Sequence, residues 1–303
     1  MASFGTIRFW QAVCTACLFS ALLTGLFWPL SCEAQQKRYR PPPDYVQLSR
    51  PDQEVGRRAL AEFRSVGLRD SFYLEFVLRV LPRRGAERRI EGRLWEAHEG
   101  ADSFRRLELN PTSANQAATS RLLLQGGNAP QVWLWRPEGD GGVKTLGGKA
   151  IFDRLDGTDL TPFDLQMPFL EWKDVEFEGV RKIRGRPSHS FLFYPPSDYA
   201  AWQPSLSGVR VYLDTQYNAL VQVEQLGEQG RIEKSMSVLD LKKVGERWIV
   251  KTIDVRDEIT RNKTRFSVTA AALGQSFSGM LFSPAELGNQ LQAPVLGLTR
   301  IEP

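Results

Sequence analysis

The chain has 303 residues, of which 42% are hydrophobic and 24% charged, and its formal net charge is +4. This balance is ordinary for a globular protein with enough apolar residues to build a core. The charge is compatible with an anionic membrane surface, but it is too small to indicate a nucleic-acid-binding protein. No RNP-like, zinc-finger or basic-helix pattern occurs.

Residues 1–34 have the layout of a secretory signal peptide. The first eleven residues carry a single charge, Arg8. The apolar run AVCTACLFSALLTGLFWPL comes next, and the polar segment SCEAQQ follows it. We expect export and cleavage after Ala34. Two alternatives remain, a retained membrane anchor and lipidation at Cys32, for which Pro29 stands where a lipobox needs leucine. All three cysteines precede the cut, so the mature chain needs no disulfide.

The mature chain is expected to begin with a linker and a helix. Residues 35–51 are polar and proline-rich, which is typical of an extended linker. Residues 52–66 place Val55, Ala59, Phe63 and Val66 at helical spacing, with charged residues opposite, so the sequence predicts an amphipathic helix.

From Ser71 onward the apolar residues recur at every second position, which predicts β-strands. The run SFYLEFVLRVL puts Phe72, Leu74 and Phe76 on one face. About eleven or twelve such runs follow one another, each bounded by glycine, proline or asparagine. Because no helix of crossover length separates them, the sequence predicts an antiparallel meander.

Two short helices are expected to interrupt the strands. In residues 161–172, Thr161 can cap a helix, Pro162 can take its first position, and Asp164 stands where a capping carboxylate belongs. Near the C-terminus Ser283, Pro284 and Glu286 repeat this arrangement.

No residue pattern indicates catalysis or metal binding. The two histidines, His98 and His189, have no second ligand or base nearby in sequence, and the aspartates of residues 153–164 lack calcium-loop spacing. No G-x-S-x-G, H-E-x-x-H or phosphate-binding glycine fingerprint occurs. We therefore expect a protein that is not an enzyme and needs no cofactor or metal.

A cluster of arginines surrounds one predicted hairpin. It is either a solvated hairpin tip or a docking patch for anionic lipid headgroups or a partner protein. The docking-patch candidates are Arg83, Arg84, Arg88 and Arg89.

Three stretches of the chain resemble the outer-membrane lipoprotein-sorting protein family, the LolA-like group of the LolA/LolB superfamily. They are GTDLTPFDL at 157–165, the hairpin containing LKKVGERW at 241–248, and LFSPAEL at 281–287. In that family a G-S/T-D-hydrophobic segment enters a small helix, an L-K-K-V-x-G-x-W hairpin follows, and an F-T/S-P segment closes the domain. This chain lacks the spacer residue before Gly245.

The resemblance implies a mainly β fold, in which a strongly curved antiparallel sheet forms an unclosed half-barrel with short helices as its lid. It implies a single domain over residues 52–303, with the half-barrel at about 70–290. The apolar strand faces would line a groove and the segments 52–66 and 161–172 would cover it. The groove candidates are Phe72, Leu74, Phe76, Leu94, Leu122, Leu124, Trp133, Trp135, Ile249 and Ile253.

The function implied by the resemblance is a non-enzymatic periplasmic carrier or chaperone. Its partners would be acylated lipoproteins or other lipids, with a possible membrane-surface or transporter docking partner and no nucleic acid. One alternative is a regulatory or structural cell-envelope protein that senses lipid or lipoprotein without transporting it. A lipid-processing enzyme is a second alternative, although no nucleophile–base pair supports it.

Overall fold

The computed structural model describes residues 50–65, 71–99, 102–111, 119–127, 129–137, 142–294 and 296–302. The expected signal peptide at 1–34, Cys32, and all but the last two residues of the expected linker lie outside these ranges. Among the described residues, no helix combines the length and the apolar character that crossing a membrane requires.

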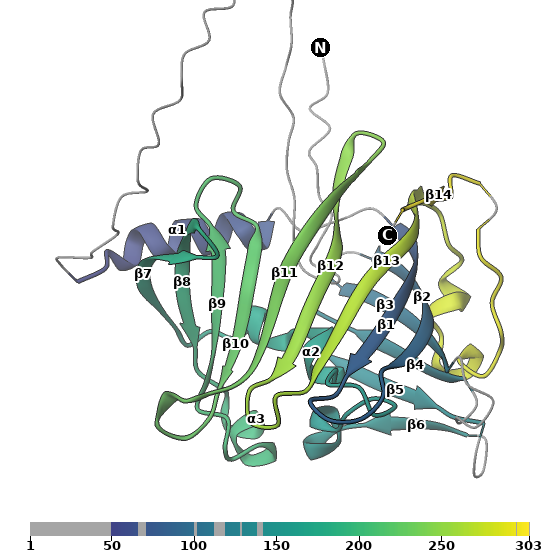
Figure 1. The fold of residues 1–303 in the computed structure, drawn as a ribbon, viewed down its shortest axis with the longest axis horizontal. Helices are drawn as coiled ribbons and strands as arrows, with labels where there is room; N and C mark the ends of the chain where they lie inside the picture. The colour runs from purple at the N-terminus through teal and green to yellow at the C-terminus, as the bar shows by residue number, and fades with distance from the viewer. Residues whose placement is uncertain are drawn as a thin grey trace, which may run out of the picture.

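The described residues form a mainly β structure with one antiparallel sheet that does not close into a barrel (Figure 1). The strand order is β6-β5-β4-β3-β2-β1-β13-β12-β11-β10-β9-β8-β7, and the short β14 pairs with β13. The predicted meander and half-barrel are therefore confirmed. The strands are β1 Ser71–Leu81, β2 Arg88–Glu99, β3 Asp102–Pro111, β4 Ser120–Gln125, β5 Gln131–Trp135, β6 Val143–Leu146, β7 Val175–Ile183, β8 Arg186–Phe193, β9 Gly208–Asp214, β10 Leu220–Leu226, β11 Ile232–Val244, β12 Arg247–Asp257, β13 Lys263–Gln275 and β14 Thr299–Arg300.

The sheet consists of two meanders joined by strands far apart in the chain. Strands β1–β6 and β7–β13 each pair in sequence order, and β1 pairs with β13, so that Leu81 lies opposite Lys263. Both outer strands, β6 and β7, are left as edges. The sequence does not predict β6, because its four residues VKTL are too few to show alternation.

Short helices precede, connect, interrupt and follow the two meanders. The described α-helices are α1 Gln53–Ser65, α2 Pro162–Gln166 and α3 Ser197–Trp202, and the 3₁₀ turns are η1 Gly148–Phe152, η2 Pro168–Glu171, η3 Glu228–Gly230, η4 Gly279–Phe282 and η5 Pro284–Glu286. Helix α1 matches the predicted helix to within one residue at each end. Helix α3 is too short to give a periodic signal in the sequence.

The capping prediction holds at one of its two places. Thr161 and Asp164 form a reciprocal capping box at the start of α2, with Pro162 in the first turn. Met167 ends α2 in the left-handed region, at φ 50°. At the C-terminal site, however, the Ser283 side chain makes no capping hydrogen bond, since η5 is a single turn.

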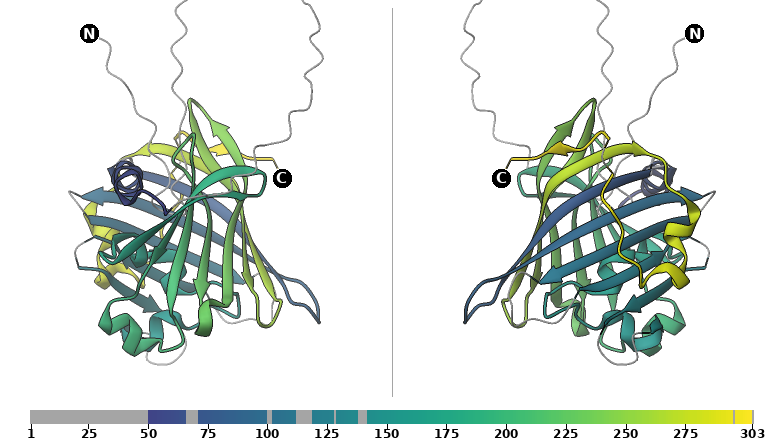
Figure 2. Two further views of the ribbon diagram at one scale, coloured as in Figure 1. Left: turned by 90° about the vertical axis from the view of Figure 1, so that its left-hand side faces the viewer. Right: turned by 90° about the vertical axis from the view of Figure 1, so that its right-hand side faces the viewer.

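Each face of the curved sheet carries an apolar cluster. The larger cluster lies on the concave face, where α1, η1, α2, η2 and α3 pack against it. The smaller cluster lies on the outer face of β1–β5 and is covered by the C-terminal residues 277–294 and 296–298, which run along these strands (Figure 2). Both apolar clusters are thus covered by other segments of the described chain.

Candidate functional site: the concave face and its covering helices

Eight of the ten predicted groove residues lie together on the concave face. Each is at most 2% exposed, and all eight belong to one continuous apolar cluster. They come from both meanders, because the β1–β13 pairing brings the two halves of the sheet together. These eight are Phe72, Leu74, Phe76, Leu94, Leu122, Leu124, Ile249 and Ile253. Their role as ligand contacts stays a prediction.

Trp133 and Trp135 lie on the opposite face, which corrects the expectation that all ten share one surface. Both are partly buried against the outer cluster, whereas their neighbours Val132 and Leu134 belong to the concave one. The guanidinium of Arg121 stacks 4.4 Å from the Trp135 ring. Alternation correctly put the two tryptophans on one face of β5, but it cannot tell which face is concave.

The concave face is filled by the segment 148–172, which we call the plug. Phe163 is its centre, with ring centroids 4.6 Å from Phe152, 5.6 Å from Phe169 and 6.1 Å from both Trp172 and Tyr199 of α3. Phe163 is fully buried. Aromatic side chains of the protein therefore occupy the space that an acyl chain would need.

Polar contacts fix the plug to the sheet. The carboxylate of Asp164 accepts hydrogen bonds from Gln225 at 2.6 Å and from Lys234 at 2.8 Å. Gln166 donates to the carbonyl oxygen of Gln125 at 2.7 Å, and Thr264 donates to Asp159 at 2.9 Å. These bonds reach the plug from strands of both meanders, so it is held from two sides.

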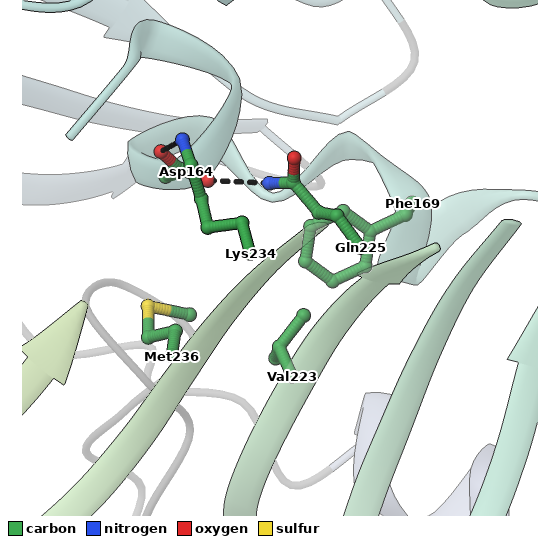
Figure 3. Close-up of a pocket in the computed structure, with 6 residues that line it drawn as sticks. All are labelled: Asp164, Phe169, Val223, Gln225, Lys234 and Met236. Carbon is green, nitrogen blue, oxygen red and sulfur yellow. Dashed lines mark hydrogen bonds and ion pairs between the residues drawn. The ribbon is translucent and has the colours of Figure 1, made fainter. Parts of the chain in front are cut away.

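A small hollow lies between the plug and strands β10 and β11 (Figure 3). It has room for about one water molecule. In Figure 3 the Asp164 contacts with Lys234 and Gln225 lie along one side of it. Its lining residues are Asp164, Phe169, Val223, Gln225, Lys234 and Met236. The hollow is too small for an acyl chain.

Helix α1 is the second cover of the concave face, and fewer contacts hold it. Only Gly56, Leu60 and Phe63 of this helix are buried. The Gln53 amide donates to the carbonyl of Phe177 and accepts from its N–H, both at 2.9 Å, so it satisfies the open edge of β7 as another strand would. Arg64 donates to the carbonyl of Leu170 at 2.7 Å.

One charged pair is buried within the apolar concave face. Arg105 donates through Nε to Glu96 at 2.9 Å and through Nη1 to the carbonyl of Leu165 in the plug at 3.0 Å. Burial raises the pKa of Glu96 to about 7, although the nearby Arg105 acts to lower it. The Nε2 atom of His98 lies 3.6 Å from the second oxygen of Glu96. This pair links the sheet to the plug.

A second buried charged group holds the C-terminal segment on the outer face. Arg106 is fully buried and donates to the carbonyls of Leu281, Glu286, Leu287 and Asn289. Arg121 donates to the carbonyl of Gly288. We call residues 277–294 and 296–298 the strap. Its backbone carbonyls are thus paired with guanidinium groups of β3 and β4.

Four buried charged residues were not predicted as functional or structural sites from the sequence: Glu96, Arg105, Arg106 and Arg121. The available signal was FRRLELN, in which consecutive arginines of one strand must point to opposite faces. A strand in a sheet covered on both sides buries both arginines, which requires a partner for each.

The two histidines lie in different surroundings, His98 beside Glu96 and His189 between aromatic rings. His189 packs between Phe177 and Phe191, with ring centroids 5.6 Å and 6.3 Å away, and burial lowers its pKa. Within the described ranges, no three His, Cys, Asp or Glu residues come together as metal ligands.

Comparisons with known proteins agree with this fold. A family model described as "-like: Uncharacterized protein" matches residues 109–289, more than half of the chain. No curated protein matches the sequence. The solved structure of a DUF1329 family protein from Desulfovibrio piger has a TM-score of 0.67 at 14% identity, over 77% of this chain and 98% of that one.

Two further solved structures share the architecture. An outer membrane lipoprotein-sorting protein domain from Vibrio parahaemolyticus has a TM-score of 0.66 at 14% identity, over 76% of this chain and 97% of that one. A LolA superfamily protein from Nitrosomonas europaea has a TM-score of 0.57 at 12% identity, over 75% and 96%. The chain therefore belongs to the uncharacterized protein family whose model matches residues 109–289, and its fold is that of the LolA-like outer-membrane lipoprotein-sorting proteins.

Proposed function

We propose that the protein binds an acyl chain, from a lipoprotein or another lipid, on the concave face of its half-barrel, and that it carries this cargo through the periplasm without chemical change. The observation that carries the proposal is a continuous apolar concave face that is closed by short, separately attached helices rather than by a second sheet. The proposal includes export, with cleavage after Ala34. The fold likeness to the lipoprotein-sorting protein domain from Vibrio parahaemolyticus supports the proposal.

An acyl chain can reach the concave face only if part of its cover moves away, and helix α1 is the more weakly held part. Undocking α1 exposes Leu60 and Phe63, which costs roughly 1.5–3 kcal/mol each. Its few hydrogen bonds to the sheet and plug add about 1 kcal/mol each. Burying about twelve methylenes of an acyl chain returns some 10 kcal/mol at ~0.8 kcal/mol per methylene. Before the entropic cost of association, the gain from burying the acyl chain is therefore similar in size to the cost of undocking α1, whereas moving the plug as well requires breaking the polar contacts of Asp164 and Gln166.

A fluorescent fatty acid tests the proposal. We expect saturable binding to the purified protein at micromolar concentration, with competition by unlabelled fatty acid and none by a soluble short-chain acid. Absence of binding by folded protein, checked by circular dichroism, would refute the carrier proposal.

The second candidate is a regulatory or structural envelope protein. This candidate is favoured because the protein's own aromatic side chains fill the concave face. The hollow beside the plug has space for about one water molecule. Such a protein would keep α1 and the plug in place. Absence of fatty-acid binding would favour a permanently closed envelope protein over the carrier, because a closed half-barrel has no place for the fatty acid, whereas an envelope protein that senses lipid would bind it without transporting it.

A further inference from the structure

The tips of two hairpins form one surface at the end of the sheet. The turn between β1 and β2 lies beside the turn between β12 and β13, since Leu81 pairs with Lys263. The N–H of Arg83 donates to the side-chain oxygen of Asn262 at 2.9 Å, which joins the two turns. Figure 2 shows the β1–β2 hairpin extending past the neighbouring strands. We call this surface, residues 82–89 and 257–262, the arginine tip.

Some charged side chains of the arginine tip form ion pairs within the protein, and others do not. Glu87 binds Arg79 through two hydrogen bonds, at 2.6 Å and 3.0 Å, and Glu258 lies within 3.4 Å of both Arg256 and Arg261. Arg83 and Arg84 are exposed, and neither side chain has an ion pair among the described residues. The acidic groups of the tip are thus engaged, and the two arginines at its apex are left to attract an external anion.

An exposed isoleucine lies on the same surface. Ile259 is 59% exposed at the apex of the β12–β13 turn. The carboxylate of Asp257 accepts from the N–H groups of Ile259 at 2.9 Å and Thr260 at 2.7 Å, and Arg261 closes the turn at φ 65°. The turn is ordered by its own hydrogen bonds and presents Ile259 outward.

We propose that the arginine tip docks on an anionic phospholipid bilayer, with Arg83 and Arg84 at the headgroups and Ile259 inserted between them. Basic residues beside an apolar side chain match a surface of negative headgroups over hydrocarbon. Because only two arginines and one isoleucine would contact the bilayer, we expect weak, reversible binding of the protein rather than stable anchoring. This inference does not depend on the proposed carrier function.

The arginine tip adjoins the plug. Arg88 donates to the carbonyl of Gly157 at 2.7 Å, and Arg154 of the plug pairs with Asp257 of the β12–β13 turn. The two turns of the arginine tip lie at the end of the sheet where α2 and α3 are found (Figure 1). Docking would therefore bring the plug end of the half-barrel next to the bilayer.

Vesicle co-sedimentation tests the inference, with vesicles of phosphatidylcholine alone and of phosphatidylcholine mixed with phosphatidylglycerol in roughly equal amounts. We expect wild-type protein to bind only the mixed vesicles and to dissociate at ~1 M salt, where the Debye length is about 3 Å. Arg83→Gln with Arg84→Gln should weaken binding about 25-fold, or about fivefold per arginine. Ile259→Ser should weaken binding about tenfold at every salt concentration at which the wild-type protein still binds.

A matched pair of substitutions controls for net charge. Lys182 and Arg184 are exposed at the β7–β8 turn, which the alternation of the meander places at the opposite end of the sheet. Lys182→Gln with Arg184→Gln makes the same charge change and should leave vesicle binding within about twofold of wild type. Equal losses in both double variants, or no binding of wild type to mixed vesicles, would overturn the inference. In the second case an acidic protein surface would become the partner to test.

Discussion

Gly56 of α1 lies directly against Phe177 of β7, so that a Cβ atom at position 56 would overlap the Cβ and Cγ atoms of the phenylalanine. Glycine is an unfavourable residue within a helix, by about 1 kcal/mol relative to alanine. Close packing of α1 on the edge strand explains its presence here. The contact also offers a way to loosen α1 without touching the rest of the concave face.

Gly56→Ala should lower the free energy of unfolding although alanine favours helix formation. We expect a loss of about 1–3 kcal/mol, because Phe177 must leave its position or α1 must move away. If α1 covers a binding surface, fatty-acid affinity should rise at the same time. Urea unfolding and probe titration measure the two effects. Gly279→Ala is the control, since a Cβ there meets no atom within 4 Å, and a stabilised Gly56→Ala variant would contradict the packing argument.

A brominated fatty acid should quench tryptophans of the concave face and not those of the outer face. Trp172 belongs to the concave cluster, whereas Trp133 packs against the outer one. We expect Trp172→Phe to remove a large part of the quenching and Trp133→Phe to preserve it, as read by steady-state fluorescence. The reverse result would place the ligand under the strap.

Glu96→Gln should flatten the pH dependence of stability between about pH 4.5 and pH 7. Because burial raises the pKa of Glu96 to about 7 from an ordinary value of 4.5, the native state binds more protons than the unfolded state in this window. The Glu96 contribution therefore makes the free energy of unfolding fall as pH rises, and it is constant above the window. Urea unfolding at several pH values measures the slope. Exposed Glu228 provides the control Glu228→Gln, and equal slopes in wild type and Glu96→Gln would rule out this role.

Arg106→Lys should release the strap from the outer face. Lysine cannot reproduce the planar donor set that reaches the carbonyls of Leu281, Glu286 and Leu287, and buried Glu108 would lose its neighbour at 3.7 Å. We expect a loss of about 3–5 kcal/mol and faster amide hydrogen exchange in residues 279–291. Arg79→Lys, on the exposed part of the same face, should change stability by less than about 0.5 kcal/mol. Unchanged exchange in the strap would contradict the role of Arg106.

Local patterns in the sequence determined most of the elements of this protein. Period-two alternation predicted β1–β5 and β7–β13, and the Thr161–Asp164 capping box predicted the start of α2, because these signals arise within a few residues of the chain. The order of the strands within each meander could also be predicted from the sequence, since neighbouring strands of a meander are joined by short turns.

The faces of the sheet were decided only by the tertiary structure. In β4 the consecutive residues Leu122, Leu123 and Leu124 are all buried, because the plug covers one face and the strap covers the other. With both faces apolar, alternation no longer distinguishes inside from outside, and Trp133 and Trp135 were placed on the wrong one. The roles of Arg105 and Arg106 were hidden for the same reason. Their partners, the carbonyls of Leu165 and of residues 281–289, are distant in sequence and come near only when the two covers pack on the sheet.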